Sequence, residues 1–161
     1  DLDSNIGTPD LVIYNPSSRL PGGIADLDPH ATLESLKVTC FGAFLIAQQA
    51  ASRMQKRGSG SIFFTGASAG VKAFPNSSVF AMGKFGLRAL AQSLARELHP
   101  KNIHIGHFVI DGGIRSNSTA NKSVDQTLDP DAIAQIYLDF FKQHRSAWAW
   151  EIELRPWVET F

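Results

Sequence analysis

The stretch that decides the fold runs from Ser61 to Lys84 and reads SIFFTGASAGVKAFPNSSVFAMGK. Its first residues, Ser61 to Thr65, form a short apolar run that predicts a strand buried inside a sheet. A turn of small residues follows, and after a polar loop the pattern predicts a helix that carries Phe80 and Lys84. Side chains four positions apart share one helix face, so these two should have the same surroundings. A strand end, a glycine-rich turn and a helix start in succession are where open α/β sheets place their functional sites.

Strands and helices alternate outward from this stretch. Further apolar runs predict strands at Leu11–Tyr14, Ile103–Ile110 and Trp148–Leu154. Helices are predicted from Asp28 to about Arg57, from about Ser77 to Leu98, and from Asp129 to about Gln143. The first and third open with an Asp-Pro pair, in which Asp caps the helix and Pro fits its first position. This alternation predicts an α/β fold, a Rossmann-like doubly wound parallel sheet of which the chain covers roughly the last four strands.

Three finer predictions concern packing. The first helix should run unbroken for roughly 40 Å, with its apolar residues against the sheet; these are Leu33, Leu36, Cys40, Phe44 and Ala47. Gly83 and Gly86 each weaken the next helix by roughly 1 kcal/mol relative to Ala, which indicates that another element packs closely there. The polar segment from Arg115 to Leu128 has no periodic pattern and is predicted to be a structureless, mobile flap over the strand ends.

Composition excludes several classes of protein. The chain has 161 residues, zero formal net charge and no basic run longer than two residues, so it is expected to be a single domain, 1–161, that does not bind nucleic acid. Cys40 is its only cysteine, which excludes a disulfide framework. His99, His104 and His107 show no metal-ligand spacing with a carboxylate or Cys partner and are interpreted as structural or surface residues. No apolar run approaches the roughly 20 residues of a membrane span, and the polar start shows no signal peptide, so a cytoplasmic protein is expected.

The central stretch resembles the active-site segment of the short-chain dehydrogenase/reductase family. That family has a serine just past a strand and, about a dozen residues later, a Tyr-x-x-x-Lys motif on a helix. Phe80 stands here at the Tyr position and Lys84 at the Lys position. The family spacing places the serine position on Ala67, with Ser68 beside it.

Three other segments extend the resemblance in the correct order. The segment DLVIYNPS, residues 10–17, is similar to the family's strand that ends in Asn-Asn-Ala-Gly, with Asn15 on the second Asn. VTCFGAFL, residues 38–45, resembles the helix whose Val-Asn supplies a fourth catalytic residue, and Thr39 stands at that Asn. VIDGGIRS, residues 109–116, is similar to the Pro-Gly-x-x-x-Thr stretch, with Gly112 for Pro and Ser116 near the Thr.

The resemblance implies an NAD(P)-dependent oxidoreductase that transfers hydride between a nicotinamide and a small carbonyl or alcohol substrate. Lys84 would lower the pKa of the missing tyrosine and hold the nicotinamide ribose, and Thr39 could hold a relay water. Phe80 cannot donate a proton and Ala67 lacks a hydroxyl, so Ser68 and, as a replacement acid, Tyr14 are further candidates. The implied cofactor-binding residues are Asn15, Lys84, Gly113, Ile114 and Ser116.

Plainer interpretations stay open beside these. Lys84 could be a solvated helix lysine, Ser68 could satisfy backbone groups of its turn, and the whole protein could be a catalytically inactive binding or scaffold protein with this fold. The resemblance also implies a homodimer or homotetramer that pairs through the two long helices.

The glycine-rich cofactor half of the family's domain is not found in this sequence. Thr65 to Val71, TGASAGV, is close to that glycine-rich turn in letters. Lys72 at the third glycine position and the Pro75-Asn76 break argue against a pyrophosphate loop. The chain is therefore interpreted as a C-terminal fragment that binds no cofactor and is inactive by itself.

Overall fold

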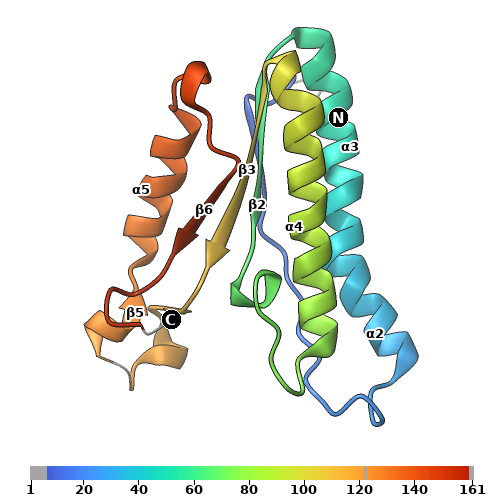
Figure 1. The fold of residues 1–161 in the computed structure, drawn as a ribbon, viewed down its shortest axis with the longest axis vertical. Helices are drawn as coiled ribbons and strands as arrows, with labels where there is room; N and C mark the ends of the chain where they lie inside the picture. Colours follow the sequence, from blue (N-terminus) through green and yellow to red (C-terminus); the bar gives the residue numbers. More distant parts are fainter. Residues whose placement is uncertain (1–6, 122, 160–161) are drawn as a thin grey trace.

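A computed structural model describes residues 7–121 and 123–159. Four strands form one parallel sheet in the order β1, β2, β3, β6 (Figure 1). They are β1 (Leu11–Tyr14), β2 (Gly60–Thr65), β3 (Ile103–Ile110) and β6 (Glu151–Leu154). The predicted α/β fold with a parallel sheet is confirmed, although the last strand begins three residues later than the pattern suggested.

Helices cover both faces of the sheet. α3 (Gly42–Arg57) and α4 (Ser78–Leu98) lie side by side on one face, α5 (Pro130–Phe141) lies on the other, and α2 (Pro29–Leu36) extends the α3 layer toward one end (Figure 1). Strand residues alternate between two cores. Ile62 and Phe64 pack toward α3 and α4, whereas Phe63 and Phe108 pack toward α5. Burial on both faces explains why the strands read as continuous apolar runs.

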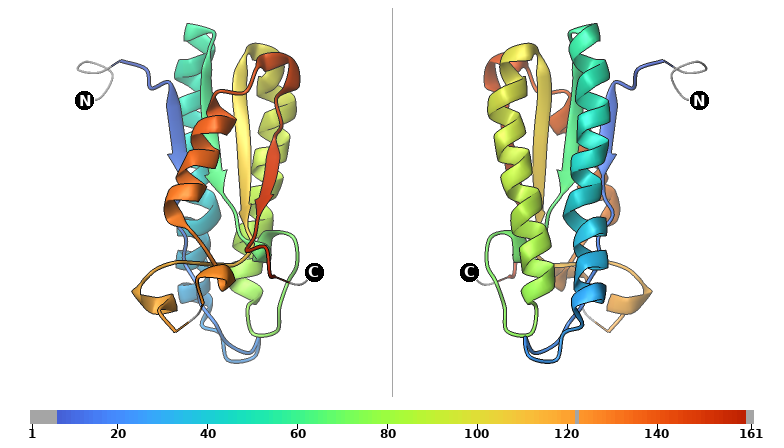
Figure 2. Two further views of the ribbon diagram at one scale, coloured as in Figure 1. Left: turned by 90° about the vertical axis from the view of Figure 1, so that its left-hand side faces the viewer. Right: turned by 90° about the vertical axis from the view of Figure 1, so that its right-hand side faces the viewer.

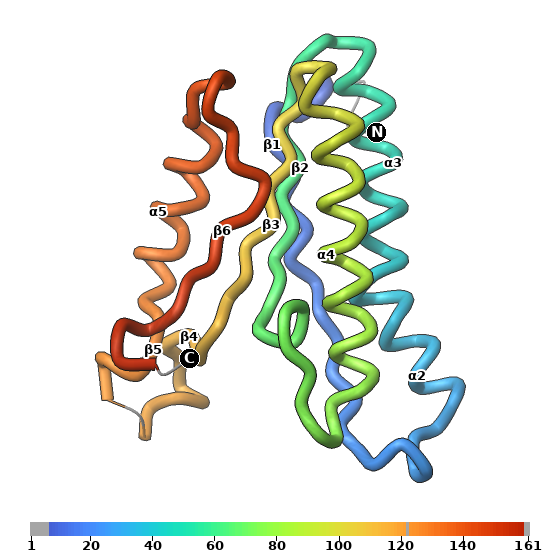
Figure 3. The backbone as a smooth tube through the Cα atoms, viewed as in Figure 1, coloured from blue at the N-terminus to red at the C-terminus, as the bar shows by residue number. Residues whose placement is uncertain are grey.

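The crossovers do not all have the same hand. The chain steps across the sheet in one direction from β1 to β2, β3 and β6, as the backbone trace in Figure 3 shows. Its first two connections pass over the α3–α4 face and the third passes over the α5 face. The third crossover is therefore opposite in hand to the first two, which is rare because nearly all βαβ units are right-handed.

The first helix is interrupted, contrary to the prediction of one continuous element. α2 ends at Leu36, a π-helical turn spans Lys37–Phe41, and α3 follows. The Tyr14 hydroxyl donates a 2.5 Å hydrogen bond to the Val38 carbonyl within this turn. The ends agree with the prediction, since the Asp28 side chain accepts from the N–H of Ala31 and Gly58 ends the helix at a φ of 80°.

The prediction of which helix residues face the sheet holds for Ala47, which is buried, but is wrong for Leu33 and Phe44. Leu33 is 52% exposed and Phe44 42% exposed. The face that α3 buries consists of small residues and one methionine, namely Ala43, Ala47, Ala50, Ala51 and Met54. The π turn inserts an extra residue into the helical repeat, so a stripe drawn with one continuous period does not follow a single face on both sides of the turn.

The segment from Arg115 to Leu128 is not structureless. β4 (Gly113–Ile114) and β5 (Thr127–Leu128) pair in parallel and close the segment at its base. Two 3₁₀ turns lie between them, Asn117–Thr119 and Val124–Gln126, and each is stabilised by a reciprocal side-chain cap from Ser116 or Ser123. The pattern of apolar residues gives no signal for such polar caps, and for this reason the sequence alone predicts the segment to be structureless.

Candidate active site

The predicted site residues gather at one end of the molecule, where the strands end. Figure 2 shows that the segments after β1, β2 and β3 lie together at this end. Parallel strands place all their carboxyl ends at one edge of a sheet, which is where α/β proteins bind ligands.

Lys84 is a buried residue of α4, with 2% of its surface exposed. Its ammonium donates a 2.7 Å hydrogen bond to the carbonyl of Thr65, the last residue of β2. Burial, with a smaller contribution from the charge of Arg19, lowers the pKa of Lys84 to about 8. Lys84 is therefore not the solvated surface lysine of the plainer interpretation.

Phe80 lies one turn before Lys84 on the same face, 7% exposed. The Lys84 Nζ is 5.8 Å from the centroid of its ring, and the guanidinium carbon of Arg19 is 4.4 Å from the same centroid. The predicted pairing of positions 80 and 84 is present. Arg19 was missed because it follows a turn-rich segment and belongs to no motif in the sequence.

Thr39 lies in the π turn and is buried. Its hydroxyl accepts a 3.0 Å hydrogen bond from the Ser18 N–H and lies 3.3 Å from the Ser18 carbonyl, to which it donates. The Ser35 hydroxyl donates to the same carbonyl. Thr39 therefore fixes the segment that carries Arg19, and its hydroxyl is already engaged by protein groups.

Close helix packing explains the glycines of α4. A Cβ on Gly83 would lie 2.8 Å from the Thr39 methyl carbon, and one on Gly86 would lie 2.9 Å from the Cys40 sulfur. α4 can therefore approach the π turn only with glycine at these positions. This agrees with the close packing predicted from the two glycines.

Ala67 and Ser68 lie in the turn after β2, where a 3₁₀ turn spans Ser68–Gly70. The Gly66 N–H donates to the Phe108 carbonyl, the Gly70 N–H to Ala67, and the N–H groups of residues 71 and 72 to Ser68. These four donors are engaged by backbone carbonyls and are therefore not available to a diphosphate. This turn is therefore not a pyrophosphate loop.

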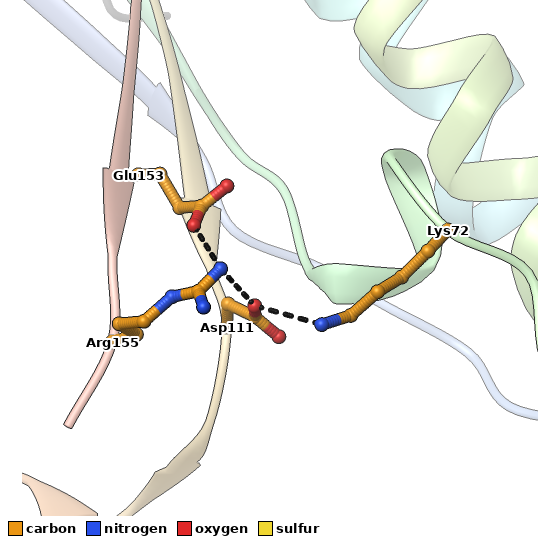
Figure 4. Close-up of polar contacts among 4 residues, drawn as sticks. All are labelled: Lys72, Asp111, Glu153 and Arg155. Carbon is orange, nitrogen blue, oxygen red and sulfur yellow. Dashed lines mark hydrogen bonds and ion pairs between the residues drawn. The ribbon is translucent and has the colours of Figure 1, made fainter. Parts of the chain in front are cut away.

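Asp111 lies directly after β3, and its carboxylate forms ion pairs with side chains of two other segments. Its carboxylate accepts hydrogen bonds from Lys72 at 3.1 Å and Arg155 at 2.8 Å, and Arg155 also pairs with Glu153 (Figure 4). Burial alone would raise the pKa of Asp111, but the hydrogen bonds of Ser68 and Lys72 and the charges of Lys72 and Arg155 lower it below the usual value. The network fixes the turn that carries Ser68 to the end of the sheet.

A second set of polar contacts, among Arg88, Glu151 and His107, lies next to the turn after β2. Arg88 donates two 2.7 Å hydrogen bonds to Glu151, whose carboxylate also lies 2.9 Å from Nδ1 of His107. His107 is fully buried, and burial lowers its pKa against the opposing effect of Glu151, so we assign a neutral ring that donates from Nδ1. A Cβ on Gly66 would lie 2.4 Å from Nε2 of His107. His107 therefore supports the turn and does not face the site.

The predicted cofactor residues do not all lie in one place. Asn15 and Ile114, together with Thr65, line a largely apolar groove of about 500 Å³ on the α5 side of the strand ends. The phenol of Tyr137 also lines this groove, 2.8 Å from the Thr65 hydroxyl, and burial raises its pKa to about 12. Gly113 lies in β4 beside the groove, whereas the Ser116 hydroxyl caps the next turn.

Other candidates have structural roles. Tyr14 is buried and its hydroxyl is bonded to the Val38 carbonyl, so it does not point into the site as a replacement acid. Within residues 7–121 and 123–159 there is no cluster of three metal-ligating side chains. No helix of this described part of the chain is long and apolar enough to cross a membrane.

Comparison with known proteins decides the family. The family model described as short chain dehydrogenase matches residues 2–127. This chain belongs to the short chain dehydrogenase family. The predicted resemblance is confirmed, and the match includes the positions of Asn15, Thr39, Phe80 and Lys84.

Curated relatives in this family are dehydrogenases and reductases. The chain is 31% identical over 99 residues to 17-beta-hydroxysteroid dehydrogenase type 1 of Homo sapiens, a match that covers 62% of this chain and 30% of that protein. It is 29% identical over 114 residues to trans-4-hydroxycyclohexanecarboxylate dehydrogenase of Sinomonas cyclohexanicum, covering 71% and 43%. The chain thus spans less than half the length of these relatives.

Solved structures of the family have the same fold. A short-chain dehydrogenase from Rhodopseudomonas palustris has a TM-score of 0.80 and 34% identity, covering 92% of this chain and 62% of that chain. An alcohol dehydrogenase from Thermococcus sibiricus, complexed with 5-hydroxy-NADP, has a TM-score of 0.84 at 18% identity, covering 99% and 68%.

Proposed function

We propose that the protein containing this chain is an NAD(P)-dependent oxidoreductase with a divergent active site, acting on a small carbonyl or alcohol substrate. The observation that carries the proposal is the placement of Lys84. Its ammonium is buried at the end of β2, on the Thr65 carbonyl and beside Phe80. A buried lysine with a lowered pKa in a site of this family is typical of a functional group.

The groove beside Thr65 suits the nicotinamide end of such a cofactor. It offers apolar walls to a flat ring, and its polar groups include the Asn15 amide and the Thr65 hydroxyl. Asn15 and Ile114 would hold the ring, and Lys84 would hold its ribose. Gly113 and Ser116 would flank it from the β4 side. When bound, the cofactor supplies or accepts the hydride.

The site differs from the family pattern at the positions that would supply the proton. Phe80 and Ala67 provide no hydroxyl, and a positioned acid typically contributes 10²–10⁴-fold to rate. Ser68 is the nearest hydroxyl in the turn, but it is bonded to the Asp111 carboxylate. Turnover in this proposal takes its proton from water that reaches the substrate beside Phe80.

The alternative function is a binding or scaffold protein without catalysis. It is favoured by the joint absence of a phenol at position 80, a hydroxyl at position 67 and a free side chain at Thr39. Both functions are compatible with cofactor binding, so turnover must distinguish them.

The experiment compares the protein containing this chain with its Phe80→Tyr/Ala67→Ser double variant. NADH and NADPH oxidation is followed with a panel of aldehydes, ketones and oxo acids. Saturable turnover by the native protein supports the oxidoreductase, and a faster double variant would then report the restored positioned acid. Activity that appears only in the double variant supports the scaffold alternative, and inactivity of both refutes the oxidoreductase.

We also propose self-association through the outer face of α3 and α4. This face exposes a set of large apolar side chains, namely Phe41, Phe44, Leu45, Met82 and Phe85. The rings of Phe41 and Phe44 stack with centroids 6.0 Å apart. Contiguous exposed apolar residues on two neighbouring helices are typical of subunit interfaces, and the proposed assembly is a homodimer or homotetramer.

A further inference from the structure

Arg19 places a second positive charge at the site described above. It is exposed, on the segment that follows β1, and its guanidinium carbon lies 4.4 Å from the centroid of the Phe80 ring. The buried Lys84 ammonium lies 5.8 Å from the same centroid. One aromatic ring therefore contacts two cations, one facing solvent and one beneath the surface.

Neither of these two charges has a carboxylate partner within the described part of the chain. Among residues 7–121 and 123–159, no ion pair involves Arg19 or Lys84, although most other basic side chains at this end of the sheet are paired. The charge of Arg19 also disfavours the protonated form of Lys84. Two like charges held close together and uncompensated create a positive potential that an anion would neutralise.

The position of Arg19 is fixed by its neighbour. The backbone of Ser18 is hydrogen-bonded by two buried side chains, Thr39 and Ser35. A guanidinium that stacks on a ring keeps its N–H donors in its own plane, where they match the two oxygens of a carboxylate. Fixing the segment in advance lowers the entropy that binding must overcome.

We propose that Arg19 binds a carboxylate of the substrate, with Lys84 adding charge from below and Phe80 forming the flat apolar wall. The proposal rests on the oxidoreductase function above and adds a substrate class to it. The substrates would be oxo acids or hydroxy acids whose carboxylate lies close to the reacting carbon. Arg19 thereby becomes the residue that determines specificity.

Binding can be tested without turnover. The chain is titrated with oxalate while NMR follows the Arg19 Nε–H, with oxamide as the uncharged isostere and inorganic phosphate as a tetrahedral anion. Arg19→Gln should weaken oxalate binding by ~10-fold or more. Arg96→Gln should leave it unchanged, because Arg96 is an exposed arginine of α4 bonded only to Gln92 among the described residues. Arg19→Lys keeps the charge but loses the paired N–H donors of the guanidinium, so its oxalate affinity should lie between those of the native chain and Arg19→Gln.

Several results would overturn the carboxylate site. These are native-like oxalate affinity in Arg19→Gln, equal binding of oxamide, or no saturable oxalate binding by the native chain. Stronger binding of phosphate than of oxalate would replace the carboxylate with a phosphate group and so refute the substrate class. Melting temperatures of the variants confirm that each is folded.

Turnover then separates this proposal from the function on which it rests. In the protein containing this chain, kcat/KM for an oxo acid should exceed that for its neutral amide by ~10-fold or more, and Arg19→Gln should remove the preference. Equal kcat/KM for acid and amide refutes the specificity role although the enzyme is active. Absence of turnover with either compound refutes the oxidoreductase, while the oxalate titration still decides whether the anion site exists.

Discussion

At the scale of single residues, the defining feature of the site is Lys84. It is protonated at neutral pH although burial disfavours its charged form. Lys84 has a pKa of about 8 in the folded protein against 10.5 in the unfolded chain. Below pH 8 both states are protonated, so the folded state bears the full cost of the buried ammonium. Between pH 8 and 10.5 only the unfolded chain holds the proton, and the free energy of unfolding therefore rises with pH.

The test is urea unfolding of the native chain and Lys84→Met from pH 7 to 10. The stability of the native chain relative to the variant should increase with pH across this window, by at most ~3 kcal/mol. Other titrating groups cancel in the difference. A difference that stays flat would show that Lys84 titrates alike in both states.

The charge of Asp111 stabilises the fold, whereas the charge of Lys84 destabilises it, although both lowered pKa values make the free energy of unfolding rise with pH. The lowered pKa of Asp111 means that its ion pairs stabilise the fold at pH values above the usual carboxyl range and lose that contribution as the pH falls through the lowered value. Asp111→Asn should cost ~2–4 kcal/mol at neutral pH, because it leaves the nearly buried Arg155 without this charge partner. The loss should shrink in acid. The control is Asp139→Asn on the exposed face of α5, which should change stability by under ~0.5 kcal/mol.

At the scale of elements, the π turn links Arg19 to α4. Thr39 of that turn holds Ser18 on one side and contacts Gly83 on the other. Gly83→Ala should destabilise the chain by ~1–3 kcal/mol despite the better helix propensity of Ala, because its Cβ would clash with Thr39. The control Ala89→Gly, on the exposed face of α4, measures only the free-energy difference in helix propensity between Ala and Gly. A more stable Gly83→Ala variant would show that the contact is not tight.

The sequence predicted most elements because their signals are local. Asp-Pro caps and apolar runs located the helices and strands, and motif order located Phe80 and Lys84. The π turn could not be predicted, since it depends on Tyr14 and Ser18 reaching the helix from a distant segment. The Asp111 network, the neutral His107 and the position of Arg19 likewise arise from tertiary contacts that carry no sequence periodicity.

At the scale of the whole molecule, the proposed assembly rests on the outer face of α3 and α4. The proposed oligomer places Phe41 and Phe44 in a subunit interface, where a charge would be strongly unfavourable. Sedimentation at micromolar concentration should therefore show an oligomer for the native chain and a monomer for Phe44→Glu. Ile24→Glu, in an exposed loop, should have no effect. A native monomer would contradict the proposed interface.

The central claim is that Lys84 belongs to a nicotinamide cofactor site, and its most direct test is a binding titration. NADH and NADPH are titrated into the protein containing this chain and into Lys84→Met, with Lys56→Met on the exposed end of α3 as the control. The account predicts saturable binding of at least one cofactor, weakened ~10-fold or more in Lys84→Met and unchanged in the control. No binding of either cofactor at millimolar concentration, or equal affinity in Lys84→Met, would contradict it.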